Sequence, residues 1–293
     1  MRPRAFREGR SAGTVAALAE TYLRSISGLR SRPEIERRLR RDVLPIIGHI
    51  PLDELHRRDV TRVIDAKIAD APITARRVFE DVRAMVRWAV SRGDLDHSPI
   101  DGLRGPAISK PRTRVLTDPE IKAVWHDLYE LRPDVGRVVR FCLVTGQRVG
   151  EVVGLTSNEL DLPNAIWNIP AERSKNGHPH SVPLTPIALS IIEEANGSAK
   201  NPLVFGVSRN VVSDIIWRYQ TVPERYTAHD LRRSVLTGMA RLGISPIVIA
   251  NVANHRSVSK AGVTLGVYIQ HDYDDEKREA LTRWATRLQT IIG

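Results

Sequence analysis

Five short segments of this chain carry side chains that could bind an anion or move a proton. They occupy residues 145–151, 173–177, 227–233, 253–257 and 267–273. Taken one at a time, each has an ordinary structural explanation: an ion pair, a solvated lysine in a turn, a capping or packing histidine, a half-buried tyrosine. Arginine stays charged and grips anionic oxygens in a planar fork, while histidine, lysine and tyrosine exchange protons. The question is whether the five segments act together.

The first and third segments predict helix-borne arginines. Arg148 and Glu151 are three residues apart, so we expect them on one helix face. No Lys-Ser/Thr pair follows the glycines of this segment, which excludes a phosphate loop. In the third segment, Thr227 and Asp230 form a capping-box pattern, which puts His229 and Arg232 at the start of a helix. A helix N-terminus favours an anion, and these two side chains would strengthen that preference.

Helical periodicity dominates the first hundred residues. Apolar stripes predict four helices, with one stripe running through Val60, Val63, Ile64 and Ile68. In the last helix, one face is apolar and the opposite face carries Arg76, Arg83 and Arg87. That arginine stripe is either a solvated surface or a face that follows the phosphates of DNA.

The chain divides at a Gly- and Pro-rich stretch. We expect a basic N-terminal segment at 1–13, a helical domain at 14–105, a linker at 106–116 and a second domain at 117–293. Apolar runs separated by turns predict a small antiparallel sheet within residues 159–184. Helices should cover about 134–145, 187–195, 209–220, 228–241, 246–253 and 275–291. The fold class is therefore mainly α with a small antiparallel sheet.

Composition narrows the class of partner. The chain has 293 residues, 44 Lys plus Arg against 34 Asp plus Glu, and a net charge of +10. Such a balance points to a polyanion, with nucleic acid as the first candidate. The single cysteine, Cys142, lies in an apolar run and predicts a buried thiol in a reducing compartment. No apolar run is long enough for a membrane span, so we expect a cytoplasmic protein.

The ordered set of motifs resembles the tyrosine recombinase (phage integrase) family. Arg-x-x-Glu, a turn lysine, His-x-x-Arg, Asn-His and a tyrosine follow one another in the family's order, and the resemblance covers the chain from about residue 14 to its end. The segment after the tyrosine looks most like prophage-type integrases. The resemblance implies a helical core-binding domain and a mixed α/β catalytic domain that form a clamp around duplex DNA.

The resemblance also implies a role for each motif residue. Arg148 and Arg232 match the arginines that hold the scissile phosphate, and Glu151 matches the acidic residue that supports them. Lys175 matches the hairpin lysine that protonates the leaving 5′-oxygen. The product is a 3′-phosphotyrosine link that stores the bond energy, so neither ATP, metal nor other cofactor is expected.

The remaining matches are the histidines and the tyrosine. His229 matches the first histidine and is the plausible base, whereas His255 matches the position held by His or Trp. Tyr268 matches the nucleophile; Tyr273, five residues later, is the alternative. Asn254 departs from the pattern, because many members have glycine before the histidine.

The implied activity is site-specific recombination that integrates or excises a mobile element. Its partners would be double-stranded DNA and an accessory DNA-bending protein. On two DNA sites the chain would form a homotetramer, and the free protein can be a monomer. A type IB-like topoisomerase and a non-catalytic DNA-binding protein of the same fold are the alternatives. Prophage integrases commonly carry a further N-terminal arm-binding domain, so the chain is either a two-domain recombinase or a piece of a longer protein.

Two other features have competing explanations. His178 and His180 could form a metal pair, but without a third ligand they are better explained as solvent-exposed strand histidines. The C-terminal stripe of Leu281, Trp284, Leu288 and Ile291 fits a helix that packs on its own domain. In the resembling family such a segment often docks on a neighbouring protomer instead.

Overall fold

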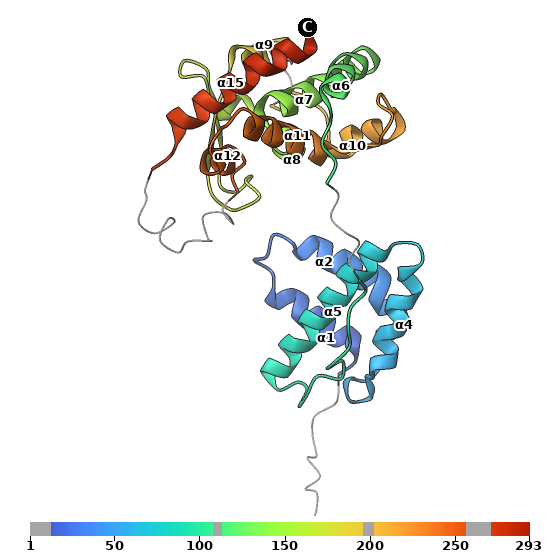
Figure 1. The fold of residues 1–293 in the computed structure, drawn as a ribbon. Helices are drawn as coiled ribbons and strands as arrows, with labels where there is room; N and C mark the ends of the chain where they lie inside the picture. The colour runs from blue at the N-terminus through green and yellow to red at the C-terminus, as the bar shows by residue number, and fades with distance from the viewer. Residues whose placement is uncertain (1–12, 108–112, 196–201, 256–270) are drawn as a thin grey trace, which may run out of the picture. The chain divides into compact units, whose positions relative to one another are not determined.

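The computed structural model describes residues 13–107, 113–195, 202–255 and 271–293. The chain splits into two compact units, Met1–Pro111 and Arg112–Gly293, each with its own hydrophobic core. Figure 1 shows helices in both units and a small sheet in the second. The mainly helical fold class predicted from the sequence is confirmed.

The regular elements of unit 1 in its described residues are all helical. Its elements are α1 (Val15–Ser25), α2 (Arg32–Arg38), the π-helical turn η1 (Leu39–Val43), α3 (Leu44–Ile47), the 3-10 turn η2 (Leu52–Glu54), α4 (Arg57–Ile68) and α5 (Pro72–Arg92). Helix α5 begins with proline in its first turn and ends at Gly93, whose φ of +75° suits glycine. Ile68, expected in the core stripe, is instead 40% exposed, because α4 ends at this residue.

Unit 2 wraps several helices around one buried helix. Its elements are α6 (Asp118–Leu131), α7 (Pro133–Thr145), α8 (Val149–Val152), η3 (Ser157–Glu159), β1 (Leu160–Asp161), β2 (Ile166–Ile169), β3 (His180–Pro183), α9 (Pro186–Ala195), α10 (Arg209–Arg218), α11 (Ala228–Arg241), α12 (Pro246–Val252) and α15 (Asp274–Ile292). The sheet is antiparallel in the order β1-β2-β3.

Helix α7 forms the centre of this core, and α6, α9, α11 and α15 all pack against it. Phe141 contacts the rings of Trp167 from β2 and Phe205, with centroids 5.7 and 5.3 Å away. The thiol of Cys142 is buried as expected, and desolvation raises its pKa to about 12. This thiol is therefore a packing group rather than a nucleophile.

The C-terminal helix α15 packs on its own unit. Leu281, Trp284 and Leu288 are all buried, and the indole Nε1 of Trp284 donates to the carbonyl of Leu143 at 2.7 Å. A Cβ at Gly238 of α11 would overlap the Trp284 ring, so glycine permits this close approach. The packing favours the intramolecular explanation of the C-terminal stripe.

Candidate active site

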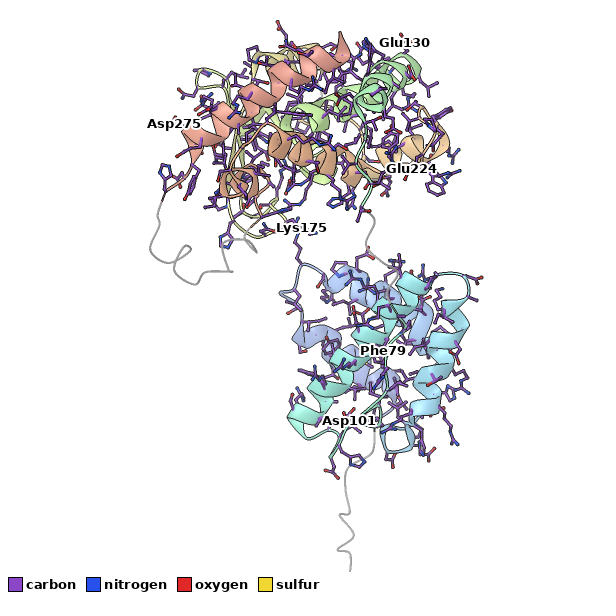
Figure 2. All side chains as sticks on the ribbon, viewed as in Figure 1. Phe79, Asp101, Glu130, Lys175, Glu224 and Asp275 are labelled. Atoms are coloured by element: carbon purple, nitrogen blue, oxygen red, sulfur yellow. The ribbon has the colours of Figure 1, made fainter. Side chains whose placement is uncertain are left out.

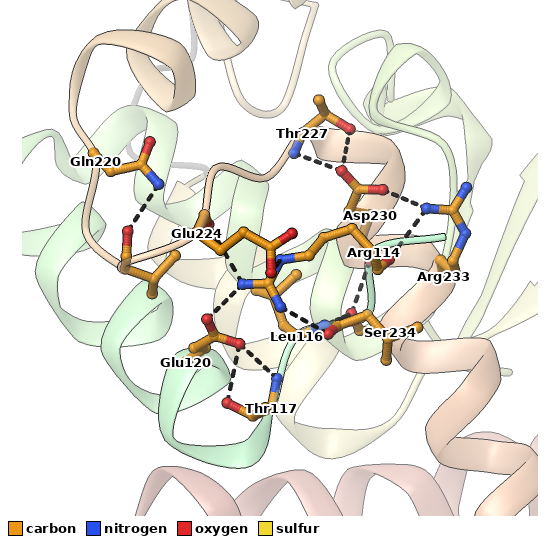
Figure 3. A network of polar contacts seen from close by, with 12 residues as sticks. Arg114, Leu116, Thr117, Glu120, Gln220, Glu224, Thr227, Asp230, Arg233 and Ser234 are labelled. Carbon is orange, nitrogen blue, oxygen red and sulfur yellow. Dashed lines mark hydrogen bonds and ion pairs between the residues drawn. The ribbon is translucent and has the colours of Figure 1, made fainter. Parts of the chain in front are cut away.

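The candidate site is built on α11, which a polar network ties to the beginning of unit 2 (Figure 3). Thr227 caps the helix, because its backbone N–H and hydroxyl both donate to the Asp230 carboxylate at 2.9 and 2.8 Å. Ser234 accepts from the backbone N–H of Leu116 at 2.8 Å. The capping box predicted from the sequence is present, and α11 has the predicted bounds.

The same network holds the strand-like segment before α6. Arg114 pairs with Glu120 at 2.5 Å and with Glu224 at 3.3 Å, while its carbonyl accepts from Arg233 at 3.1 Å. Arg114 holds the pKa of the Glu120 carboxyl down, at about 2. Charged groups therefore fix the position of α11, the helix that carries His229 and Arg232.

Arg148 and Glu151 form the expected ion pair, but by a different local route. Arg148 is not inside a helix: it is the extended N-cap of α8, with φ −72° and ψ 136°. Its Nη1 lies 2.9 Å from Glu151 Oε1, and Glu151 Oε2 accepts from the Arg148 backbone N–H at 3.3 Å. Because Glu151 is 3% exposed, this carboxylate fixes both the backbone and the side chain of Arg148.

Arg232 is almost wholly buried beside this pair. Its Nη1 donates to the Gly146 carbonyl at 2.9 Å, and its Nη2 donates to the Ala253 carbonyl and lies 3.3 Å from His255 Nε2. Burial and the charge of Arg148 lower the pKa of its guanidinium to about 10. The group still carries its charge at neutral pH, held in a single orientation.

The carbonyl groups at the C-terminal end of α12 accept hydrogen bonds from several neighbouring elements. Three consecutive carbonyls accept side-chain donors: that of Val252 from Gln147 at 2.9 Å, that of Ala253 from Arg232, and that of Asn254 from Asn176. The last carbonyls of a helix lack intrahelical partners, so they are natural acceptors. They connect the Gly146–Arg148 segment, α11 and the β2–β3 hairpin to the residues just before His255.

The two histidines are neutral at physiological pH in the free protein. Desolvation and the charges of Arg232 and Arg148 lower the pKa of His255 to about 4. Desolvation, Arg233 and Arg232 also lower the pKa of His229. Because Arg232 is a donor, His255 Nε2 is an acceptor here, and its Nδ1 carries the proton. Such a site attracts an added negative charge.

Lys175 lies in the hairpin between β2 and β3, at the edge of unit 2 (Figure 2). Two residues earlier, Arg173 pairs with the largely buried Glu159 at 2.5 Å and donates to the Glu151 carbonyl at 3.1 Å. A Cβ at Gly154 would overlap the Arg173 guanidinium. The charge of Lys175 acts on both His255 and His229, so the hairpin lies near the histidines.

The comparisons agree with this arrangement. Residues 116–274 match the model described as "Phage integrase family", and residues 17–106 match "Phage integrase central domain". The chain belongs to the phage integrase family. Its enzyme class is therefore the tyrosine-type site-specific DNA recombinases, as predicted.

Relatives in this family are distant in sequence and similar in fold. Prophage integrase IntA of Escherichia coli (strain K12) is 25% identical over 267 residues, which cover 86% of this chain and 63% of IntA. A lambda integrase dimer bound to a COC′ core site aligns with a TM-score of 0.70 and 15% identity over 84% of this chain and 97% of that one. A lambda integrase tetramer bound to a Holliday junction aligns with a TM-score of 0.68 and 15% identity, over 83% of this chain and 77% of that one.

Tyr268 lies outside the described residues, so its predicted role as nucleophile stays a prediction. Tyr273 is described: it precedes α15 as its N-cap, with a φ of 54°, and its ring lies 4.6 Å from that of His271. Its carbonyl accepts from the Lys277 backbone N–H at 2.8 Å. Tyr273 thus begins a helix of this phage integrase.

In unit 1, the three arginines of the predicted stripe on α5 are not equivalent. Arg76 pairs with Glu80 at 2.9 Å and donates to the Pro106 carbonyl at 3.0 Å, so it has a structural role. Arg83 and Arg87 are exposed, with no hydrogen bond or ion pair to any described residue. Of the three, Arg83 and Arg87 are the ones whose side chains are free to contact a ligand.

The prediction that His180 is solvent-exposed is wrong. His178 is exposed, but His180 is only 8% exposed in β3. Burial and the charge of Lys277 lower its pKa to about 3, and its ring bonds to the backbone of Val252.

No group of three or more His, Cys, Asp or Glu in the described ranges could hold a metal. Within those ranges, no helix is long and apolar enough to cross a membrane.

Sequence reasoning missed the residues that support the site. Gln147 and Arg173 are partly or wholly buried and bridge separate elements, and Asn254 was noted only as a departure from the family pattern. No local signal marks Gln147, because its partner Val252 is remote in the sequence. Asn254 did carry a signal: an asparagine at a glycine position indicates a left-handed backbone.

Proposed function

We propose that this phage integrase cuts and rejoins DNA at a specific site through a 3′-phosphotyrosine at Tyr268, to integrate or excise a mobile element. The observation that carries the proposal is the cluster of cationic and imidazole side chains in unit 2, where Arg148, Arg232 and His255 lie together and the charge of Lys175 acts on His255. A phosphodiester gains negative charge as it is attacked. Fixed guanidiniums that require no reorganisation suit that developing charge.

Each side chain has a role in this scheme. Arg148 and Arg232 hold the non-bridging phosphate oxygens, and Glu151 keeps Arg148 in place. His229, neutral because of its lowered pKa, accepts the proton of the attacking tyrosine. His255 donates from Nδ1 to a phosphate oxygen. A tyrosine is mostly protonated at neutral pH, so it needs both the base and the surrounding positive charge.

The leaving group completes the reaction. The P–O5′ bond breaks as the tyrosine oxygen bonds to phosphorus, and Lys175 supplies the proton that the departing 5′-oxygen takes. Ligation runs the same steps in reverse, with the 5′-hydroxyl as nucleophile and the tyrosine as leaving group. Since one ester bond replaces another, no external energy source is required.

The two units would divide the labour on duplex DNA. The core-type domain at 14–105, with Arg83 and Arg87 exposed on α5, would follow the phosphate backbone, and the domain at 117–293 would perform the chemistry. Lambda integrase forms a tetramer on a Holliday junction. By analogy, we infer that four protomers act on two sites in the cytoplasm, on nucleoid DNA and with an accessory DNA-bending protein.

The test is covalent capture on DNA. A library of nicked suicide duplexes, drawn from genomic and attachment-like fragments, is incubated with wild type, Tyr268→Phe and Tyr273→Phe, and adducts are separated on a denaturing gel. We expect an adduct that disappears only in Tyr268→Phe. An adduct that survives in Tyr268→Phe but not in Tyr273→Phe would show that Tyr273 is the nucleophile.

The same gel discriminates among the alternatives. Salt-dependent binding without an adduct on any fragment would contradict the proposed chemistry and favour a DNA-binding protein of the same fold. Relaxation of a supercoiled plasmid without a paired site would favour a topoisomerase. Strand exchange between two copies of the captured fragment would support recombination.

A further inference from the structure

Asn254 has an unusual backbone conformation for a residue with a side chain. Its φ is +45°, in the left-handed region where glycine is favoured and asparagine is tolerated. It directly precedes His255, and it is only 8% exposed. A buried asparagine in a left-handed turn needs partners for its amide, and the partners reveal what it does.

Those partners lie on both sides of Lys175. The Asn254 side-chain Nδ2 donates to Ser174 Oγ at 3.0 Å, and the Asn254 carbonyl accepts from the Asn176 side-chain Nδ2. Ser174 is fully buried. One asparagine thus makes two hydrogen bonds to the residues that flank the hairpin lysine, one as donor and one as acceptor.

The other side of Asn254 faces the arginine and histidine. The neighbouring Ala253 carbonyl accepts from Arg232 Nη2, which also lies 3.3 Å from His255 Nε2. The backbone N–H of His255 donates to the Ala250 carbonyl at 2.8 Å. Residues 253–255 are therefore fixed to α11 on one side and to the hairpin on the other.

We propose that Asn254 is a positioning residue that sets Lys175 relative to the phosphate bound at Arg232 and His255. This inference rests on the proposed function. Lysine has a flexible four-carbon stem, and Lys175 is exposed, so its ammonium samples many positions unless its backbone is anchored. The two hydrogen bonds anchor that backbone, and proton delivery to the 5′-oxygen depends on the resulting alignment.

The substitution that isolates this role is Asn254→Gly. Glycine keeps the left-handed backbone but removes the amide that reaches Ser174. We expect single-turnover cleavage of an ordinary suicide duplex to slow at least tenfold. Asn176→Ala should slow it by a similar factor, and Asn251→Ala, whose side chain bonds only within α12, should leave the rate unchanged.

A bridging 5′-phosphorothiolate in the same duplex distinguishes positioning from general damage. A thiolate leaving group has a pKa far below that of an alkoxide, so it departs without a proton from lysine. We expect this substrate to bring Asn254→Gly and Lys175→Ala back to within about threefold of wild type. A defect in Asn254→Gly that the sulfur substrate does not relieve would overturn the proposal, as would cleavage of the ordinary duplex at the wild-type rate.

Hydrogen exchange on the protein alone tests the link without DNA. The amides of Arg173, Ser174 and Gly177 donate within the turn, so they should be protected in wild type. They should exchange several-fold faster in Asn254→Gly and at the wild-type rate in Asn251→Ala. Unchanged exchange in Asn254→Gly would overturn the positioning role. Wild type that forms no adduct on either substrate would instead contradict the proposed function, whatever the exchange shows.

Discussion

Two helices of this phage integrase present arginines in opposite ways. On α11, Arg232 is 1% exposed and has each terminal nitrogen held by a backbone carbonyl. On α5, Arg83 and Arg87 project from an exposed face without partners in the described structure. A single substitution at either place removes one positive charge, but the physical consequences should differ greatly.

The two places differ in the stage at which the arginine side chain loses its conformational freedom. Folding has already fixed Arg232, so it can meet a developing charge without rearrangement. In the proposed function, Arg83 and Arg87 would keep their side-chain freedom and their hydration until DNA binds. Attraction to phosphate then comes mostly from counterion release, which depends on salt and not on exact geometry. Buried arginine therefore suits catalysis, and exposed arginine suits affinity.

The largest expected effect is at Arg232. Arg232→Lys should lower single-turnover cleavage by about 10³-fold, because one ammonium cannot donate to the Gly146 and Ala253 carbonyls and also face the phosphate. Arg241→Ala, at the exposed end of the same helix, is the control and should cleave normally. Fragment binding by gel shift verifies that the variant is folded. Cleavage by Arg232→Lys within tenfold of wild type would contradict a fixed guanidinium.

The next effect concerns the buried histidine beneath the site. The folded pKa of His180 is lowered to about 3, so the unfolded chain takes up a proton near pH 6.5 that the folded chain refuses. The stability linked to neutral His180 is present above pH 6.5 and is lost as the pH falls. Between pH 7 and pH 4, wild type should lose about 3 kcal/mol relative to His180→Gln, measured by urea unfolding. His178→Gln, at an exposed position of the same hairpin, should keep the wild-type pH dependence.

A smaller effect should come from the glycine under Arg173. Gly154→Ala should lower the free energy of unfolding by about 2 kcal/mol, because the added methyl overlaps the guanidinium that pairs with Glu159. Gly150→Ala is the matched control, since its nearest atom would lie at an ordinary 3.8 Å. Equal stability of the two variants in urea would show that Arg173 moves aside without cost.

The smallest effects should be those on α5. Arg83→Ala and Arg87→Ala should each weaken binding to the captured DNA fragment by about fivefold and reduce the salt slope by about 1, with no change in cleavage at saturating DNA. Arg76→Ala, which loses its bonds to Glu80 and Pro106, should leave the salt slope unchanged and lower stability. Salt titrations of fluorescence anisotropy measure all three. An unchanged slope in both Arg83→Ala and Arg87→Ala would contradict a DNA-facing α5.

Local signals predicted most of the fold. The capping pair Thr227 and Asp230 predicted the start of α11, and apolar runs separated by turns predicted the small antiparallel sheet. These features depend on neighbours in the chain, so the sequence displays them directly. The arginine–glutamate pair was also predicted. In the structure, however, Glu151 lies in the first turn of α8, and Arg148 is the extended N-cap residue before it.

Features that depend on distant partners could not be read in the same way. His180 is buried, and its pKa responds to Val252 of α12 and Lys277 of α15, both far away in the sequence. No pattern near His180 predicts these neighbours. Arg76 resembled its neighbours Arg83 and Arg87 in the helical stripe, yet Pro106 and Glu80 occupy it. The ordered motifs predict which residues act, and that assignment stays a prediction; they did not predict the bonds that orient Arg232.

The link between Asn254 and the hairpin has a consequence for how the sequence can drift over evolutionary time. Ser174 bonds to the side chain of Asn254, so a change to glycine at 254 would remove that contact, whereas Asn176 would keep its bond to the backbone carbonyl of residue 254. Conversely, loss of Ser174 would leave a buried amide on Asn254 unsatisfied and would favour its replacement by glycine. Positions 174 and 254 should therefore vary as a pair among lineages, whereas Lys175, the residue after position 174, should not follow that covariation.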